Sequence, residues 1–428
     1  MVMTKIEKLR SLLLYLLFLS LPFSIAGGNF AIVGLYLVTA YLLIIKKDNY
    51  KGFPLFFWGM AALMIAAILS SLLSENPVES LKYIRTFWRF GLPFVLILAF
   101  PNNNYEKYIR VTLVVSILIS IYSIIQFFTG LDILRSDYLQ GKYHHYKSVW
   151  QAVGVFSHHL TLGGVFLIIF SLLTGLFFSN EISRPLKYFY FLGAFLSLIT
   201  AFLTLGRSIW LGLIIVIVVF LSILIPPKYK KILAIVVIIV VAISWVAIKR
   251  MDTNLISKTS IGTRAISAVS LTANKDRLLM WKAGVSVIKD HPILGLGPNM
   301  GHQIKPYYRK IAKKENHQFQ HEPGVGLHNI YIQTWVDYGI LGLMGFLLMY
   351  LSLIKGIESR LNYLNVRQSN ENAILLGIMA GLCGNMVSGF FENNFRDGEV
   401  QIMILVAMGL ALSILHKMKN NPVENPPI

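Results

Sequence analysis

The sequence predicts an all-α polytopic membrane protein with about twelve transmembrane helices. Three observations predict this class. The chain is 55% hydrophobic, its mean hydropathy is +0.63, and only 14% of its residues are charged, against about 25% in soluble domains. Apolar runs recur along its whole length. Its 39 Lys and Arg outnumber its 20 Asp and Glu, so that the net charge is +19. These values exclude a disordered, collagen-like or coiled-coil chain and an ordinary soluble enzyme.

Helices that cross a bilayer need about 20 apolar residues each. Twelve candidate spans lie at 11–26, 29–45, 53–73, 84–100, 108–130, 160–179, 186–205, 208–225, 231–248, 329–355, 371–391 and 399–415. The first span follows three basic residues, as in a signal peptide, but further spans come directly after it. We therefore interpret it as an uncleaved transmembrane helix. The long span at 329–355 predicts either one tilted helix or two pieces broken near Gly339 and Gly342.

Basic residues on the short loops set the orientation. With the N-terminus in the cytoplasm, the short loops on the inside hold 18 basic residues: Lys5, Lys8, Arg10, Lys46, Lys47, Lys51, Lys107, Arg110, Arg184, Lys187, Lys228, Lys230, Lys231, Lys355, Arg360, Arg367, Lys417 and Lys419. This is the positive-inside pattern, so both termini are expected in the cytoplasm. The expected organisation is nine membrane helices in 1–248, an outer loop at 249–327, three helices in 328–416 and a tail at 417–428.

The outer loop carries thirteen basic and five acidic residues, a net charge of +8. Within 274–291, Leu278, Trp281, Val285 and Ile288 recur at helical spacing, and the Pro and Gly of the following HPILGLGPNMG end the pattern. A basic stretch, IKPYYRKIAKKENHQF, comes next. We expect one or two short helices lying over the membrane face. The positive charge indicates attraction for phosphorylated lipids, because nucleic acid is not expected at that face.

Nothing in the sequence requires a metal or another cofactor. Cys383 is alone in an apolar run, so no disulfide or zinc site can be built on it. His-His pairs occur at 144–145 and 158–159, without clustered carboxylates, which favours interfacial or substrate-contacting histidines over a metal site. The GLG at 295–297 is a lone glycine pair and a weak indication of a nucleotide loop.

Three basic positions border apolar spans on the outer side, namely Arg207, Arg277 and His328. Arg207 can equally be a snorkelling interfacial arginine, Arg277 a helix-surface charge and His328 a capping histidine. Together they suggest chemistry, because two guanidiniums match a pyrophosphate and a histidine can accept a proton from a hydroxyl. Asp337, nine residues after His328, is expected to pair with an arginine.

Three sequence pieces resemble the O-antigen ligase/polymerase family of bacterial envelope glycosyltransferases. They are TLGRSIWLG around Arg207, the D-R-x-x-x-W-x-x-A…HPILGLGPN pattern at 276–299, and H-N-x-Y-I-Q-x-x-x-D-Y-G-I-L-G-L-x-G-F at 328–346. The third piece is the most specific. The twelve spans and the large loop before the His-bearing helix also agree with that family, and the first 150 residues contribute topology only.

The resemblance implies a metal-independent, inverting, GT-C-like glycosyltransferase of the bacterial inner membrane with a large helical periplasmic loop. Such an enzyme takes a glycan from undecaprenyl pyrophosphate on the periplasmic side, and in the ligases the acceptor is a sugar hydroxyl of lipid A–core. Carried over to this sequence, Arg207 and Arg277 hold the pyrophosphate and His328 is the general base. Asn329 and an acidic residue of the last outer loop contact substrate. In GFFENNFRDGE that residue is Glu392, Asp397 or Glu399, of which we favour Glu392.

Four alternatives stay open. An O-antigen polymerase shares the chemistry and uses a lipid-linked repeat unit as its acceptor. A protein O-oligosaccharyltransferase keeps the site and changes the acceptor to a protein hydroxyl. A transporter or flippase of a different class also fits twelve spans, but it usually shows internal repeats, midplane charges and broken helices. A non-catalytic scaffold leaves the +8 loop and Arg207 without an explanation.

Overall fold

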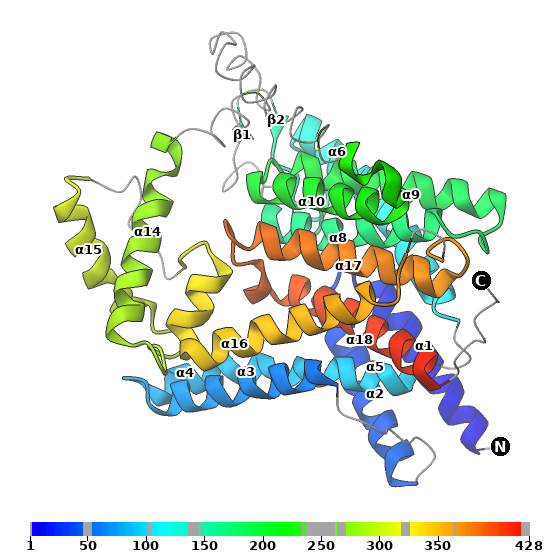
Figure 1. Cartoon of the computed structure of the whole chain (residues 1–428), viewed down its shortest axis with the longest axis horizontal. Helices are drawn as coiled ribbons and strands as arrows, with labels where there is room; N and C mark the ends of the chain where they lie inside the picture. Colours follow the sequence, from blue (N-terminus) through cyan, green and yellow to red (C-terminus); the bar gives the residue numbers. More distant parts are fainter. Residues whose placement is uncertain are drawn as a thin grey trace. The chain divides into compact units, whose positions relative to one another are not determined.

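The computed structural model describes residues 2–45, 54–100, 104–135, 145–146, 149–232, 235, 262, 271–317, 326–362 and 365–420. The elements in chain order are α1 (Val2–Ser20), α2 (Ile25–Ile44), α3 (Leu55–Leu72), α4 (Pro77–Ile84), η1 (Arg85–Gly91), α5 (Leu92–Ala99), α6 (Glu106–Thr129), β1 (His145–Tyr146), β2 (Val149–Trp150), α8 (His159–Phe177), α9 (Arg184–Leu203), α10 (Arg207–Leu224), α14 (Leu271–Asp290), η3 (Gly301–Ile304), α15 (Lys305–Lys314), α16 (Ile330–Glu358), α17 (Asn370–Ser388), η4 (Asn394–Arg396) and α18 (Gly398–Asn420) (Figure 1).

Helices dominate the described residues, and nine of those helices are long and apolar enough to cross a membrane: α2, α3, α6, α8, α9, α10, α16, α17 and α18. The predicted class, an all-α polytopic membrane protein, is thereby confirmed. The only strands among the described residues are β1 and β2, two residues each, paired antiparallel. Of the twelve predicted spans, the one at 231–248 lies outside the described residues apart from 231, 232 and 235.

One predicted span is wrong as a single helix. Residues 84–100 form the short 3-10 helix η1 followed by the eight-residue α5. Pro93 stands in the first turn of α5. A proline inside a continuous α-helix lacks the N–H donor and its ring collides with the carbonyl four residues earlier, here that of Arg89. The chain therefore changes its helical geometry before Pro93, and the Leu92 N–H bonds to the Arg89 carbonyl instead.

The chain divides into two compact units, each built from separate stretches of sequence. The first unit contains residues 1–115, 276–360 and 389–428, and the second contains 116–275 and 361–388. In the second unit α8 packs against α9 and α17, and α17 also packs against α10. In that unit the side chain of Gln126 holds the loop after β2, because its Oε1 accepts the Gly154 N–H at 2.7 Å and its Nε2 donates to the Gly154 carbonyl at 2.9 Å.

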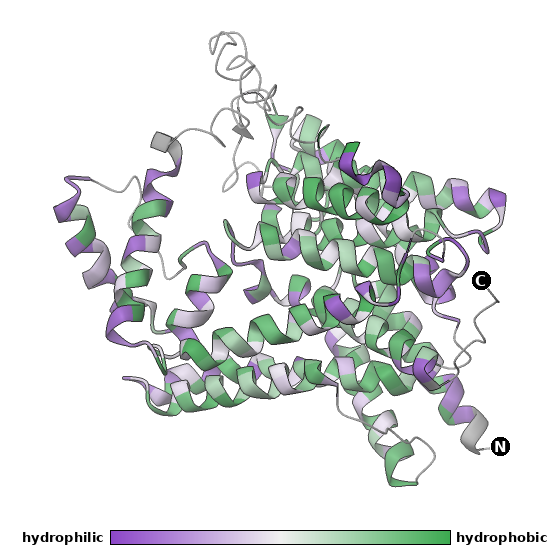
Figure 2. Ribbon diagram, viewed as in Figure 1, coloured by the Kyte–Doolittle hydropathy of each residue, from purple (hydrophilic) through white to green (hydrophobic). Residues whose placement is uncertain are grey.

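In the first unit α16 runs along α3, and Figure 1 shows the two helices side by side. Glycines permit their close contact. A Cβ at Gly345 would lie 2.6 Å from the backbone nitrogen of Leu63, and one at Gly59 would lie 2.6 Å from that of Met349. Small residues at such interfaces let two membrane helices approach along their backbones. Figure 2 shows both helices as mainly hydrophobic, whereas α14 and α15 carry many hydrophilic residues.

Helix α16 is broken at Gly339, where φ is 67° and ψ is −172°. Of the two alternatives for this span, one tilted helix or two pieces, the structure has two pieces with the break at Gly339, while Gly342 stays helical. The HPILGLGPN segment fills the break. The Leu296 N–H donates to the Val336 carbonyl at 2.7 Å, the Gly297 N–H donates to the Asp337 carbonyl at 3.1 Å, and the Ile340 N–H donates to the Pro292 carbonyl at 3.1 Å. Backbone groups freed by the break are thus satisfied inside the protein, as a membrane environment requires.

In the described part of the outer segment the predicted helices are present as α14 and α15. Leu278 is 40% exposed and Val285 is 43% exposed, although they belong to the stripe whose spacing predicted α14. The buried residues are Leu279, Ala283 and Val287. The last two belong to a cluster that also contains Leu296, Met300, Ile304, Tyr308, Leu327 and Val336. Both stripes have helical spacing, and the segments packed against α14 decide which one is buried.

Candidate functional site

His328 lies immediately before α16, in the backbone conformation φ 48°. Asn329 follows it as the N-cap of α16. Its side-chain oxygen accepts the N–H groups of Tyr331 and Ile332, both at 3.0 Å, and its amide nitrogen donates to the Phe390 carbonyl at 3.0 Å. The Ile330 N–H donates to the Gly389 carbonyl at 2.8 Å. The start of α16 is therefore attached to the loop between α17 and α18.

That loop brings Glu392 to His328. The imidazole Nδ1 lies 3.0 Å from Glu392 Oε1, which also accepts the Asn393 N–H at 3.2 Å. The side chain of His328 is 43% exposed and that of Glu392 is 11% exposed. Because an ionised carboxylate only accepts hydrogen bonds, Nδ1 is the donor in this contact. In the neutral form of the imidazole the other nitrogen, Nε2, is then a hydrogen-bond acceptor. Of the three acidic residues considered in the last outer loop, Glu392 is the one bonded to His328.

Arg277 of α14 completes the cluster. Its Nη2 lies 3.6 Å from Glu392 Oε2, and the arginine side chain is 25% exposed. Trp281, one turn further along α14, anchors the helix, since its Nε1 donates to the Leu327 carbonyl at 3.1 Å and its ring lies 5.8 Å from that of Phe391. Three segments that are distant in sequence thus meet around one carboxylate.

The carboxyl group of Glu392 has a pKa below its ordinary value. Burial raises the pKa, but the hydrogen bond and charge of His328 and the charge of Arg277 lower it by more in total. The carboxylate of Glu392 is consequently an anion that lies between the Arg277 guanidinium and the His328 imidazole. Such a carboxylate can orient an imidazole and stabilise the imidazolium ion that forms when the ring takes a proton.

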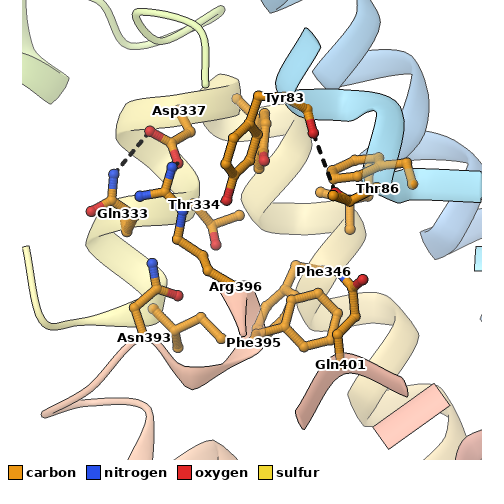
Figure 3. A pocket seen from close by; sticks show the side chains of 14 residues that line it. Tyr83, Thr86, Gln333, Thr334, Asp337, Phe346, Asn393, Phe395, Arg396 and Gln401 are labelled. Atoms are coloured by element: carbon orange, nitrogen blue, oxygen red, sulfur yellow. Dashed lines mark hydrogen bonds and ion pairs between the residues drawn. The ribbon is translucent and has the colours of Figure 1, made fainter. Parts of the chain in front are cut away.

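A second polar group lies next to this cluster. Asp337 Oδ2 is 3.6 Å from Arg396 Nη2, which confirms the expected pairing of Asp337 with an arginine. Arg396 Nε donates to the Tyr83 hydroxyl at 2.6 Å, and Gln333 Nε2 donates to Asp337 Oδ1 at 2.9 Å. These side chains line a cavity of about 70 Å³ together with aromatic residues such as Phe346 and Phe395 (Figure 3).

Sequence reasoning missed Gln333, Arg396 and Tyr83. One signal was present for Gln333, which precedes Asp337 by four residues and so shares its helix face. Arg396 and Tyr83 carried no comparable local signal, because their partners lie far away in the sequence.

Arg207 belongs to the second unit, where it is the first residue of α10. Trp210 fixes the turn before it: its ring stacks on that of Phe202 at 4.8 Å and its Nε1 donates to the Phe202 carbonyl at 2.9 Å. The structure therefore places Arg277, His328, Asn329 and Glu392 together in the first unit, and Arg207 at a helix start in the second.

The His-His pair at 158–159 lies at the start of α8. His158 caps α8 through its Nδ1, which accepts the Leu160 N–H at 3.2 Å, and its ring stacks on that of His159 at 4.4 Å. Residue 144 lies outside the described residues. In the part of the chain that the structure describes, no group of three or more His, Cys, Asp or Glu side chains could hold a metal ion. The GLG at 295–297 fills the break in α16, which is a structural role.

One comparison with known proteins finds a similar family. The family model for O-antigen ligase matches residues 192–347, a stretch that includes Arg207, Arg277 and His328 and ends within α16. No curated protein matches the chain. The matched stretch contains all three sequence pieces described above, and around it the chain has the helices of a polytopic membrane protein. Over residues 192–347 the chain is therefore similar to the O-antigen ligase family.

Proposed function

We propose that the protein is an O-antigen ligase of the bacterial inner membrane. It transfers O-antigen glycan from undecaprenyl pyrophosphate to a sugar hydroxyl of lipid A–core. The family supports an O-antigen ligase/polymerase-type glycosyltransferase, and the donor, the acceptor and the residue roles are our proposal. The observation that carries it is the cluster in which Glu392 contacts both His328 and Arg277.

His328 acts as the general base in this proposal. With Nδ1 donating to Glu392, Nε2 accepts the proton of the acceptor hydroxyl. The acceptor oxygen attacks C1 of the donor sugar, the new O–C1 bond forms, and the bond from C1 to the phosphate oxygen breaks with its electron pair leaving on the pyrophosphate. Attack from the face opposite the leaving group inverts the configuration at C1. The exposed side of the imidazole is available to such a hydroxyl, since the side chain is 43% exposed.

Arg277 and Arg207 stabilise the leaving group. A guanidinium can donate two parallel hydrogen bonds to phosphate oxygens, and its charge offsets the negative charge that develops on the pyrophosphate. Arg277 is held next to the base by Glu392. We propose that Arg207 supplies the second guanidinium. No metal ion is needed in this scheme, because the cationic side chains neutralise the leaving phosphate.

The membrane arrangement that we propose has about twelve spans, a GT-C-like fold, both termini in the cytoplasm and the cluster at the periplasmic face. Residues 249–327 then form the periplasmic loop. The positive-inside distribution supports this orientation, and the net charge of +8 in the outer loop supports attraction for the phosphorylated lipid substrates.

The main alternative is an O-antigen polymerase. Deleting the gene separates the two, because loss of a ligase leaves long polymer on the carrier lipid, whereas loss of a polymerase leaves a single repeat on lipid A–core. A protein O-oligosaccharyltransferase would instead modify protein hydroxyls. A transporter or flippase would move the lipid-linked glycan without forming a glycosidic bond, so detection of the bond with purified protein excludes it.

The direct test is glycan transfer by purified protein from a defined lipid-linked donor to lipid A–core. Replacement of Arg207, Arg277 or His328 by Ala is expected to lower the rate by at least about 10²-fold, the usual scale for a lost acid–base or electrostatic group. Matched controls are His302→Ala and Arg309→Ala, an exposed histidine and an exposed arginine of the same outer segment, which should keep their rates. Full activity in all three site variants would refute the mechanism, and a rate abolished by EDTA and restored by Mg²⁺ would refute its metal-free form.

A further inference from the structure

A run of buried polar contacts leads from the backbone before His328 into the first turns of α16. The Leu327 N–H donates to Gln333 Oε1 at 2.9 Å, and Gln333 Nε2 donates to Asp337 Oδ1 at 2.9 Å. Gln333 is 2% exposed and Asp337 is 5% exposed. Both the oxygen and the nitrogen of the Gln333 side-chain amide are therefore hydrogen-bonded. The partners fix which way the amide is turned, because the Leu327 N–H needs an acceptor and the Asp337 carboxylate needs a donor.

The same carboxylate connects to the loop that carries Glu392. Asp337 Oδ2 pairs with Arg396 at 3.6 Å, and Arg396 comes four residues after Glu392. Tyr83 holds the guanidinium from a further segment, with its hydroxyl 2.6 Å from Nε and its ring centroid 4.8 Å from the guanidinium carbon. Figure 3 shows Arg396 reaching toward Asp337, beside the Gln333–Asp337 bond. Asp337 thus links the two loops whose tips meet in the His328–Glu392 contact.

His328 needs such support. Its φ of 48° is in the left-handed region, which side chains other than glycine rarely adopt and which persists where the surroundings hold it. The chain is held on both sides of this residue, by the Leu327–Gln333 bond before it and by the Asn329 cap after it. Loss of the first bond would leave the left-handed turn free to relax and the imidazole free to move away from Glu392.

We propose that Gln333 is a positioning residue for His328, and that Arg396 has the corresponding role for Glu392. Neither acts on substrate. Gln333 sets the position of the imidazole by holding the Leu327 backbone, Arg396 sets the loop of Glu392, and Asp337 couples the two. This inference rests on the proposed role of His328 as the base, and it adds that the geometry of the base depends on a buried glutamine five residues along the chain.

A double-mutant cycle tests the proposal with the full-length protein, lipid-linked donor and lipid A–core. Gln333→Leu keeps the side chain at a similar size and removes both of its hydrogen bonds. Its kcat is expected to fall about 10- to 100-fold, the scale of a misplaced catalytic group, with little change in KM. In the His328→Ala background the same replacement should leave the residual rate unchanged, because no imidazole is left to position. Single-turnover measurements with excess protein and labelled donor resolve that residual rate.

Gln401→Leu is the matched control, since Gln401 is also buried, lines the same cavity and accepts a hydrogen bond from Arg89 at 3.3 Å. It should lower the thermal unfolding temperature without lowering kcat. If Gln333→Leu folds poorly, Arg396→Lys serves instead. It keeps the charge opposite Asp337 but cannot also reach the Tyr83 hydroxyl, and its loss of kcat should vanish in a Glu392→Gln background.

The outcomes separate the two proposals. The positioning role would be overturned if Gln333→Leu lowered kcat equally in the wild-type and the His328→Ala backgrounds, or if Gln333→Leu had the wild-type kcat. Either result would leave His328 as the base. A wild-type rate in His328→Ala would overturn the proposed function, and the positioning role with it.

Discussion

A Cβ atom on Gly339 would lie 1.8 Å from the carbonyl oxygen of Ile293. The break in α16 and the segment that fills it therefore depend on each other, because only a residue without a side chain permits both the left-handed φ and the close approach of the two backbones. Gly295 repeats the relationship from the other side, where a Cβ would lie 2.4 Å from the Val336 carbonyl oxygen.

Gly339→Ala should therefore destabilise the protein. We expect its free energy of unfolding to fall by more than about 1 kcal/mol, since the new methyl group meets backbone that cannot move aside easily. Thermal unfolding in detergent measures this. Gly356→Ala in the same helix is the control, because its Cβ would meet only Leu415 Cδ1 at 3.7 Å. That variant should be unchanged or more stable by about 0.5–1 kcal/mol. Equal unfolding temperatures for the two variants would contradict the interpretation.

Glu392→Gln should lower the transfer rate strongly while leaving the fold intact. The amide keeps the shape of the side chain but loses the negative charge that orients the imidazole and stabilises its protonated form. The expected fall is about 10²- to 10⁴-fold, as for other carboxylates that support a catalytic histidine. The rate of glycan transfer is the measurement. Asp397→Asn and Glu399→Gln, changes at the other two acidic residues of the loop, should retain most of the activity; if one of them falls as far as Glu392→Gln, the assignment of Glu392 is wrong.

The lowered pKa of Glu392 predicts a specific pH dependence of stability. A carboxyl group whose pKa is lower in the folded protein than in the unfolded chain contributes stability that is fully present above the unfolded pKa, here the ordinary value of 4.5. This contribution is lost as the pH falls through the lower pKa of the folded state. The difference in unfolding temperature between the wild type and Glu392→Gln should therefore be constant above about pH 5 and shrink in more acidic solution. A difference that grows on acidification would show that the pKa is raised.

Asn329 can be tested by separating its two bonds. Asn329→Asp keeps the oxygen that caps α16 and loses the donor to Phe390, whereas Asn329→Ala loses both. We expect Asn329→Ala to lower the free energy of unfolding by about 1 kcal/mol from the lost cap alone, and Asn329→Asp to lower it less. Kinetics with varied donor and acceptor concentrations test the predicted contact with substrate. A rise in KM, measured where the variant is still fully folded, would support a role of Asn329 in binding. An unchanged KM in both variants would restrict Asn329 to holding the two loops together.

Much of this molecule could be predicted from local sequence. The apolar runs predicted the membrane class, because burial of about 20 apolar residues in a bilayer needs no tertiary partner to be recognised. Gly339 and Gly342 indicated a break in α16 as one of two alternatives to choose between, and the spacing in 274–291 predicted a helix there. The motif residues Arg207, Arg277 and His328 belong to the sequence pieces that resemble the O-antigen ligase family, and they lie within the stretch that the family model matches.

Other features are decided by contacts between distant segments. Hydropathy alone could not show which stripe of α14 is buried, because the stripe with Leu278 and Val285 and the stripe with Leu279, Ala283 and Val287 both recur at helical intervals. Packing against other segments buries the second. The sequence offered three acidic residues for the last outer loop, and only the fold brings Glu392, 64 residues after His328, to its Nδ1. Arg396 carried no local signal for the same physical reason, since its partner Tyr83 lies 313 residues away in the sequence. Periodicity and propensity report on neighbours within a few residues, whereas the position of a catalytic side chain depends on backbone loops that meet only when the helices have packed.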